Sequence, residues 1–136
     1  MSMNEEDPKK IIENLAAQLK EFIKQPEWTP YVKTGMHKER PPLNKDWFFV
    51  RAASVLRAVG MKGPIGVAKL RNKYGGKKNN GVAKEHFYKG SGSIIRKVLQ
   101  ELDKSGLTIQ AEKGVHKGRI LTPKGQSMLT RAGFKK

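Results

Sequence analysis

The chain of 136 residues lacks cysteine, which excludes disulfide bonds and thiolate metal sites. It also lacks a long apolar run, since no stretch approaches the roughly 18 residues that a membrane-spanning helix needs. The N-terminal sequence MSMNEEDPKK is polar and acidic, unlike a secretory signal peptide. We therefore expect a soluble protein that resides in the cytoplasm.

Acidic side chains are also scarce, because 12 Asp plus Glu accompany 28 Lys plus Arg and the net charge is +16. A charge of this size attracts polyanions, and nucleic acid is the obvious one because bound phosphates release condensed counterions. The charge is unevenly distributed. Residues 1–30 contain four basic and six acidic side chains, a net charge of −2, whereas residues 31–136 carry a net charge of +18. We expect residues 31–136 to provide the binding surface.

Signals for catalysis are thin. The histidines His37, His86 and His116 each stand alone, without an acidic residue or cysteine at the spacing of metal ligands. The glycine-rich stretch at 90–93 lacks the Gly-Lys-Ser/Thr pattern of a phosphate-binding loop. The sequence therefore predicts neither an enzyme nor a bound metal or cofactor.

The first half of the chain predicts two helices joined by a long loop. Asp7-Pro8 begins a helix that apolar spacing extends to about Gln25, where Pro26 disfavours its continuation. Residues 26–44 are rich in Pro and Gly and form the loop, with Trp28 and Tyr31 as expected anchors to the core. A second helix starts at Asn44 or Asp46 and runs to about Val59; being apolar nearly all round, it should be central and buried.

The second half predicts a short helix, a basic loop at 77–92, a capped helix, a hairpin and a last helix. Ser91 or Ser93 caps the helix that follows the basic loop, and Gly106 ends that helix. Residues 107–110 and 119–121 form the hairpin, and Thr122-Pro123 opens the last helix. A helix-turn-helix followed by a two-stranded wing has this order. We predict a single mainly α, winged-helix-like domain over 1–136, with an extra N-terminal helix.

Three groups of basic residues are candidate RNA contacts. The polar edge of the second helix contains Arg51 and Arg57, for which phosphate binding and a purely structural role remain equally open. The basic run from Lys62 to Lys97 includes interleaved aromatic residues that either stack on unpaired bases or pack in the core. The hairpin turn at 113–119 either reaches nucleic acid or only adds solubility. The candidates are Arg51, Arg57, Lys69, Arg71, Lys73, Lys77, Lys78, Lys84, Lys89, Arg96, Lys97, Lys113, Lys117 and Arg119.

Several stretches resemble the archaeal and eukaryotic small-subunit ribosomal protein family nineteen-e. They keep the family's order over most of the chain: PEW at 26–28, VKTGMHKE at 32–39, WFFVRAAS at 47–54, KYGGKKNNGV at 73–82, HFYKGS at 86–91, IRKVLQEL at 95–102 and GRILTPKGQ at 118–126. The short hairpin and the end at Lys136 resemble archaeal members.

The resemblance implies a helical, winged-helix-like fold around residues 45–59 and assembly on ribosomal RNA (rRNA) in the head of the small subunit. Neighbouring ribosomal proteins would be further partners, and a role in rRNA maturation is implied by eukaryotic members. The family's RNA contacts would correspond to Arg51, Arg57, Lys73, Lys77, Lys78, Arg96 and Lys97. The free protein is expected to be a monomer. The alternative is a winged-helix DNA-binding transcriptional regulator, which would usually dimerise on a two-fold operator.

Overall fold

The computed structural model describes residues 7–35, 38, 40, 42, 45–78, 81–111 and 118–133. Within them the protein is mainly α-helical, with five α-helices and two small antiparallel hairpins. The elements in chain order are α1 (Pro8–Leu19), a short 3-10 turn (Thr29–Tyr31), α2 (Trp47–Lys62), α3 (Val67–Lys73), β1 (Gly76–Lys78), β2 (His86–Tyr88), α4 (Gly92–Lys104), β3 (Thr108–Ala111), β4 (Gly118–Leu121) and α5 (Pro123–Arg131).

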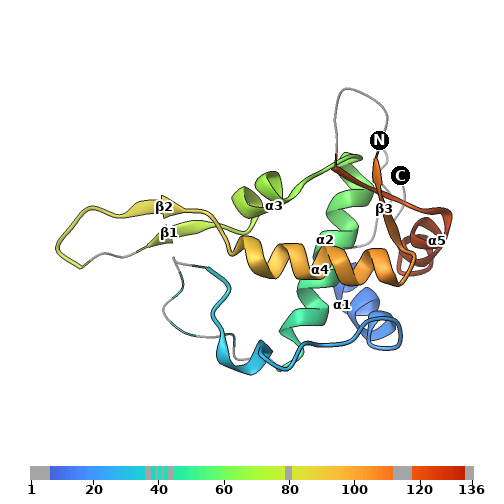
Figure 1. The fold of residues 1–136 in the computed structure, drawn as a ribbon, viewed down its shortest axis with the longest axis horizontal. Coiled ribbons are helices and arrows are strands. Elements are labelled where there is room, and N and C mark those ends of the chain that lie inside the picture. The colour runs from blue at the N-terminus through green and yellow to red at the C-terminus, as the bar shows by residue number, and fades with distance from the viewer. Residues whose placement is uncertain are drawn as a thin grey trace.

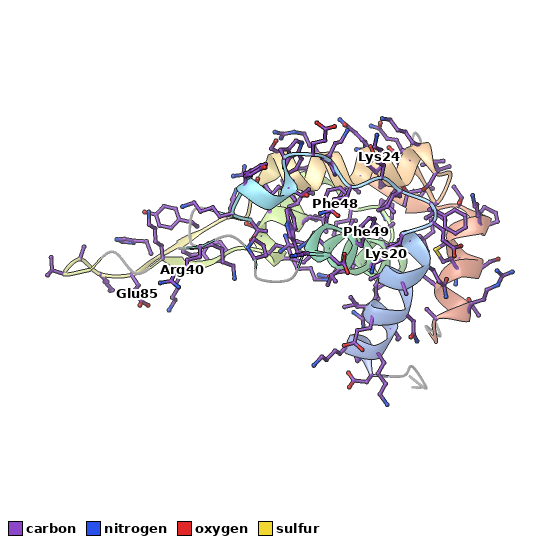
Figure 2. The ribbon with its side chains drawn as sticks, turned by 90° about the horizontal axis from the view of Figure 1, so that it is seen from below. Lys20, Lys24, Arg40, Phe48, Phe49 and Glu85 are labelled. Atoms are coloured by element: carbon purple, nitrogen blue, oxygen red, sulfur yellow. The ribbon has the colours of Figure 1, made fainter. Side chains whose placement is uncertain are left out.

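Helix α2 is the centre of the helical body, as its all-round apolar sequence predicts. It contacts α1, α4, α5 and β4, and Figure 1 shows α4 crossing it. Phe48, Val55 and Leu56 are fully buried, and Trp47 is nearly so. Trp47 and Phe49 each pack edge-on against Phe48, and Figure 2 shows Phe48 and Phe49 inside the body. The predicted core of α2 is therefore confirmed.

Two predicted helix ends are wrong. Helix α1 ends at Leu19 rather than near Gln25, because the chain tightens there into i→i+3 hydrogen bonds, such as that from the Phe22 N–H to the Leu19 carbonyl. Ile23 still reaches the core, but Phe22 remains 44% exposed. Helix α2 continues through a buried Gly60 and ends instead before Gly63, whose φ of 72° a helix cannot accommodate.

The loop after α1 is anchored differently from the prediction. Trp28 packs edge-on against Phe48 as expected, with ring centroids 6.5 Å apart. Tyr31 is 83% exposed, so its predicted anchoring role is wrong. The indole N–H of Trp47 fixes this segment instead, because it donates a hydrogen bond of 3.1 Å to the Thr29 carbonyl.

The stretch predicted as a basic loop at 77–92 contains a hairpin. Strands β1 and β2 pair antiparallel, with Gly76 opposite Tyr88, Lys77 opposite Phe87 and Lys78 opposite His86. Strand β1 consists of Gly and Lys, which have low strand propensity, and the strand-favouring Phe87 and Tyr88 of β2 form a run too short to show an alternation, so the sequence does not predict this hairpin. Figure 1 shows this hairpin projecting from the helical body along the long axis of the molecule.

The remaining local predictions are confirmed where the structure describes the residues. The Ser91 hydroxyl accepts a hydrogen bond from the Ile94 N–H at the start of α4, and the Thr122 hydroxyl accepts one from the Gly125 N–H at the start of α5. Gly106 follows α4 with a φ of 80°. Strands β3 and β4 form the second hairpin, and the predicted turn residues Lys113 and Lys117 lie outside the described residues.

Candidate nucleic-acid interface

The projecting hairpin carries cations and an aromatic ring on its two faces. Lys77 and Phe87 are opposite partners in the register and share one face; Lys77 is exposed and Phe87 is 53% exposed. Lys78 lies on the other face, with its ammonium 5.9 Å from the centre of the Tyr88 ring. Lys84 and Lys89 are exposed as well. The hairpin therefore presents positive charge together with a flat apolar surface.

The base of the hairpin is closely packed around glycine. A side-chain carbon at Gly75 would lie 2.5 Å from the Tyr88 carbonyl oxygen and 2.7 Å from Cζ of Phe87, so the Phe87 ring covers this glycine. Gly90 is held by Arg71 through two hydrogen bonds of 2.9 Å, one between the backbones and one from the Arg71 Nε to the Gly90 carbonyl. Arg71 thus contributes to the structure of the hairpin base.

The polar edge of α2 lies under Tyr74 at the end of α3. The hydroxyls of Ser54 and Tyr74 are 2.5 Å apart, and the Arg51 guanidinium lies 4.1 Å from the centre of the Tyr74 ring. Burial lowers the pKa of Arg51 and raises the pKa of Tyr74, while the Ser54 hydrogen bond and the nearby Arg51 and Arg57 oppose the increase at Tyr74. Arg51 and Arg57 are both half-buried.

Lys73 belongs to the same cluster of positive charge. Its ammonium lies 5.6 Å from the centre of the Tyr74 ring. Burial lowers the pKa of Lys73, and repulsion by Arg57 and Lys62 lowers it further. Lys73 of α3 thus lies close to the α2 edge that carries Arg51 and Arg57.

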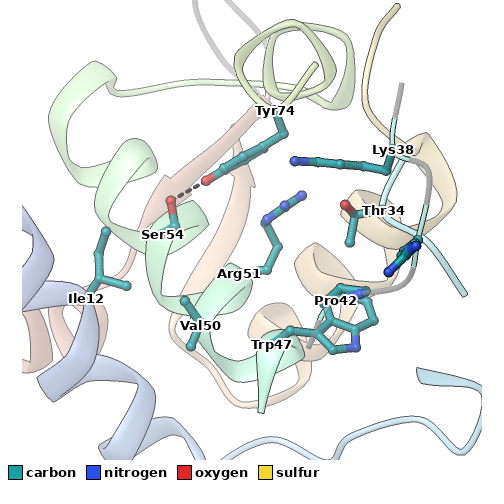
Figure 3. Close-up of a pocket in the computed structure, with 10 residues that line it drawn as sticks. Ile12, Thr34, Lys38, Pro42, Trp47, Val50, Arg51, Ser54 and Tyr74 are labelled. Carbon is teal, nitrogen blue, oxygen red and sulfur yellow. Dashed lines mark hydrogen bonds between the residues drawn. The ribbon is translucent and has the colours of Figure 1, made fainter. Parts of the chain in front are cut away.

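A pocket of about 560 Å³ opens beside this edge (Figure 3). Its cationic lining consists of Arg51 with Lys38 and Arg40, two loop residues that sequence reasoning did not select. Lys38 and Arg40 stand in a segment with no regular periodicity, so periodicity does not select them, and the stretch VKTGMHKE that resembles the family includes Lys38. The full lining is Ile12, Thr34, Lys38, Arg40, Pro42, Trp47, Val50, Arg51, Ser54 and Tyr74.

Two of the predicted contacts have acidic partners within the chain. The Lys97 ammonium lies 3.3 Å from a Glu101 carboxylate oxygen, and the Arg119 guanidinium lies 3.2 Å from Asp103, which also accepts a hydrogen bond from Thr108. Arg119 therefore helps to hold β4 against α4. Lys69 and Arg96 are exposed on α3 and α4.

The described part of the chain contains no group of His, Asp and Glu residues that could hold a metal ion. Among the same residues, no helix is both long and apolar enough to cross a membrane. The α2 edge and the β1–β2 hairpin both carry a cation beside an aromatic ring, Arg51 at Tyr74 and Lys78 at Tyr88.

Comparison with known proteins gives the family. The model of the family described as Ribosomal protein S19e matches residues 2–135. A protein of Aeropyrum pernix named small ribosomal subunit protein eS19 is 45% identical over 88% of this chain and 78% of its own length. A protein of the same name from Thermoplasma volcanium is 42% identical over 90% of this chain and 80% of its own length.

A nematode relative is equally similar. The small ribosomal subunit protein eS19G of Ascaris suum is 42% identical over 96% of this chain and 88% of its own length. Identity alone therefore does not separate the archaeal from the eukaryotic branch. With matches that extend over nearly the whole sequence, the chain belongs to the ribosomal protein S19e family.

Proposed function

We propose that this protein is a structural component of the small ribosomal subunit that binds rRNA through the β1–β2 hairpin, the polar edge of α2 and the exposed cations of α3 and α4. The single observation that carries the proposal is the family match over residues 2–135, together with relatives named as small ribosomal subunit proteins. The net charge of +16 and its concentration after residue 30 support an RNA partner.

The proposed interface is built for many modest contacts. The exposed cations occupy a projecting hairpin and two helices, so that a folded RNA could be contacted from several sides. Phosphate contacts by Lys and Arg position such a protein, and exposed aromatic rings such as Phe87 can stack on unpaired bases. The candidates Lys113 and Lys117 remain part of the proposal as predictions from the sequence.

The finer fold assignment is also a proposal. Helices α3 and α4, joined by the β1–β2 hairpin and followed by β3 and β4, fit a helix-turn-helix with an extended connection and a wing, and we propose one winged-helix-like RNA-binding domain over 1–136. Family membership favours the ribosomal function over a DNA-binding regulator. The protein would act in the cytoplasm, in the head of the small subunit beside other ribosomal proteins. It would support the assembly of that subunit and rRNA maturation. It would be monomeric when free and would perform no catalysis.

Gradient sedimentation of a cell lysate, with immunoblotting for this protein, tests the proposal. We expect the protein in the small-subunit fraction, and its release from that fraction after RNase treatment. If it sediments only with free proteins, the proposed function is wrong. A purified dimer that bound one DNA duplex more tightly than rRNA would establish the regulator instead.

A further inference from the structure

The pocket beside the polar edge of α2 combines positive charge with flat walls. Figure 3 shows Tyr74 and Lys38 at one end, Trp47 and Pro42 at the other, and Arg51 extending between them. No acidic residue is present among the described residues that line it. Because three cations and no acid occur in the described lining, the electrostatic potential of this lining favours an anion.

Arg51 is held in place by contacts within the protein. Its guanidinium lies 4.1 Å from the centre of the Tyr74 ring, and the Tyr74 hydroxyl is fixed by its hydrogen bond to Ser54 on the next turn of α2. A guanidinium that rests on an aromatic ring keeps its N–H groups directed outward, where they can donate to a phosphate. Little side-chain freedom would then be lost on binding.

The size and chemistry of the pocket restrict the occupant. Its volume of about 560 Å³ falls within the range of about 300–1,000 Å³ that is usual for small-ligand sites. Phosphate alone would leave the walls at Trp47, Val50 and Ile12 uncovered. An occupant that has one anionic group and one flat ring would contact both kinds of wall.

We propose that this pocket binds one unpaired nucleotide of an RNA, with the phosphate at Arg51, Lys38 and Arg40 and the base against the apolar and aromatic walls. The inference rests on the proposed function and adds to it a specific site for a nucleotide turned out of its helix. Unpaired bases are recognised in this way, by stacking on aromatic side chains or on the plane of an arginine. An acidic peptide would satisfy the cations but would leave the flat walls without a ring to contact.

Titration of the 15N-labelled full chain with four probes tests the proposal: uridine 5′-monophosphate, uridine, inorganic phosphate and a hexaglutamate peptide. We expect the nucleotide to shift the resonances of Arg51, Ser54 and Tyr74, and to bind more tightly than uridine, phosphate or the peptide. Substitution Val50→Phe fills the pocket without changing charge. Ile120→Phe enlarges a half-buried side chain on β4, away from the pocket, and is the matched control.

Val50→Phe should weaken nucleotide binding at least about tenfold, because the added ring occupies the space proposed for the base, and Ile120→Phe should leave it unchanged. Thermal melting checks that both variants fold. If Val50→Phe does not fold, Arg51→Lys takes its place; it keeps the charge, loses the planar group, and should also weaken binding. The proposal is overturned if the nucleotide binds the substituted pocket as tightly as the wild type, or if the peptide binds the wild type as well as the nucleotide does.

Binding of a small-subunit rRNA fragment, measured on the same proteins, separates this proposal from the proposed function. A wild-type chain that does not bind rRNA contradicts the proposed function. A wild-type chain that binds rRNA, but whose affinity for the fragment and for the nucleotide is unaffected by Val50→Phe, contradicts only the pocket proposal.

Discussion

Tyr74 connects two helices through a single side chain. Its ring covers Arg51, and its hydroxyl meets Ser54 of α2. Substitution Tyr74→Phe keeps the ring and removes the hydroxyl, so we expect the free energy of unfolding to fall by about 0.5–1.5 kcal/mol, the usual contribution of one hydrogen bond. Urea unfolding monitored by circular dichroism measures the change, and an unchanged midpoint would show that the hydroxyl contributes nothing.

The raised pKa of Tyr74 predicts a loss of stability at alkaline pH. Burial favours its neutral form in the fold, so the unfolded chain releases this proton first as the pH rises. The contribution of Tyr74 is therefore complete below the ordinary tyrosine pKa of about 10 and is lost as the pH rises through the folded-state pKa. Between about pH 8 and pH 11, the wild type should lose more stability than Tyr74→Phe. Equal losses in the two proteins would contradict this.

Leu56 lies in the middle of α2 and is fully buried. Leu56→Ala removes three carbon atoms from the packed centre, and truncations of this kind cost about 2–5 kcal/mol. For a domain with a total stability of about 5–15 kcal/mol, that loss would lower the melting temperature by many degrees. Scanning calorimetry of the wild type and the variant measures it, and an unchanged melting temperature would exclude a central position for Leu56.

For single residues, the sequence predicted burial better than it predicted side-chain contacts. The periodicity of α2 identified Phe48, Val55 and Leu56 as core, because a helix apolar on all sides must be surrounded. Periodicity carries no information about pairs distant in sequence. The Arg51–Tyr74 stack and the Arg119–Asp103 pair were therefore not predicted, and neither was the place of Lys38 and Arg40 beside Arg51.

The β1–β2 hairpin depends on the close packing of Gly75 against Phe87 and Tyr88. A Cβ at residue 75 would overlap the Tyr88 carbonyl and the Phe87 ring, so we expect Gly75→Ala to disrupt pairing at the hairpin base. The control is Gly66→Ala, where a Cβ meets nothing within 4 Å and φ is −107°. Hydrogen exchange of the strand amides should become faster in Gly75→Ala and remain unchanged in Gly66→Ala.

Loss of the hairpin should weaken rRNA binding more than it destabilises the fold, because the hairpin projects from the body (Figure 1). Gly75→Ala should therefore weaken rRNA binding while the cooperative melting of the helical body is preserved. If protected strand amides persist in Gly75→Ala, the packing described at the hairpin base is wrong.

The sequence predicted helix starts correctly where a capping side chain precedes the helix. Asp7-Pro8, Ser91 and Thr122-Pro123 correctly marked helix starts, because their side-chain oxygens satisfy free N–H groups of the first turn. The prediction failed where an element is stabilised by its partner alone. Strand β1 has no propensity signal, and β2 has only the two strand-favouring residues Phe87 and Tyr88, so both strands exist through their pairing. Helix α1 ends at a tightened turn that no Gly or Pro announces.

In the whole molecule, positive charge is concentrated after residue 30, and we expect RNA binding to depend on this distribution. Residues 1–30 carry a net charge of −2 and residues 31–136 a net charge of +18. Figure 2 shows Lys20 and Lys24 on the body, distant along the long axis from the projecting hairpin, on which Glu85 is labelled. Lys20 pairs with Asp46 at 2.8 Å, so part of the positive charge near α1 serves the fold. The sequence predicted this asymmetry from residue counts alone, but not that a projecting hairpin would carry so much of the charge.

The salt dependence of rRNA binding tests this account most directly. One variant replaces Lys77, Lys78 and Lys89 with Ala; the matched control replaces the exposed Lys9, Lys10 and Lys24 and loses the same charge. Each lost phosphate contact should flatten the slope of log affinity against log salt by about 0.7–0.9. We predict a slope flatter by roughly 2 units for the hairpin variant and nearly unchanged for the control. Equal losses in both would show that binding follows total charge and would contradict the assigned interface.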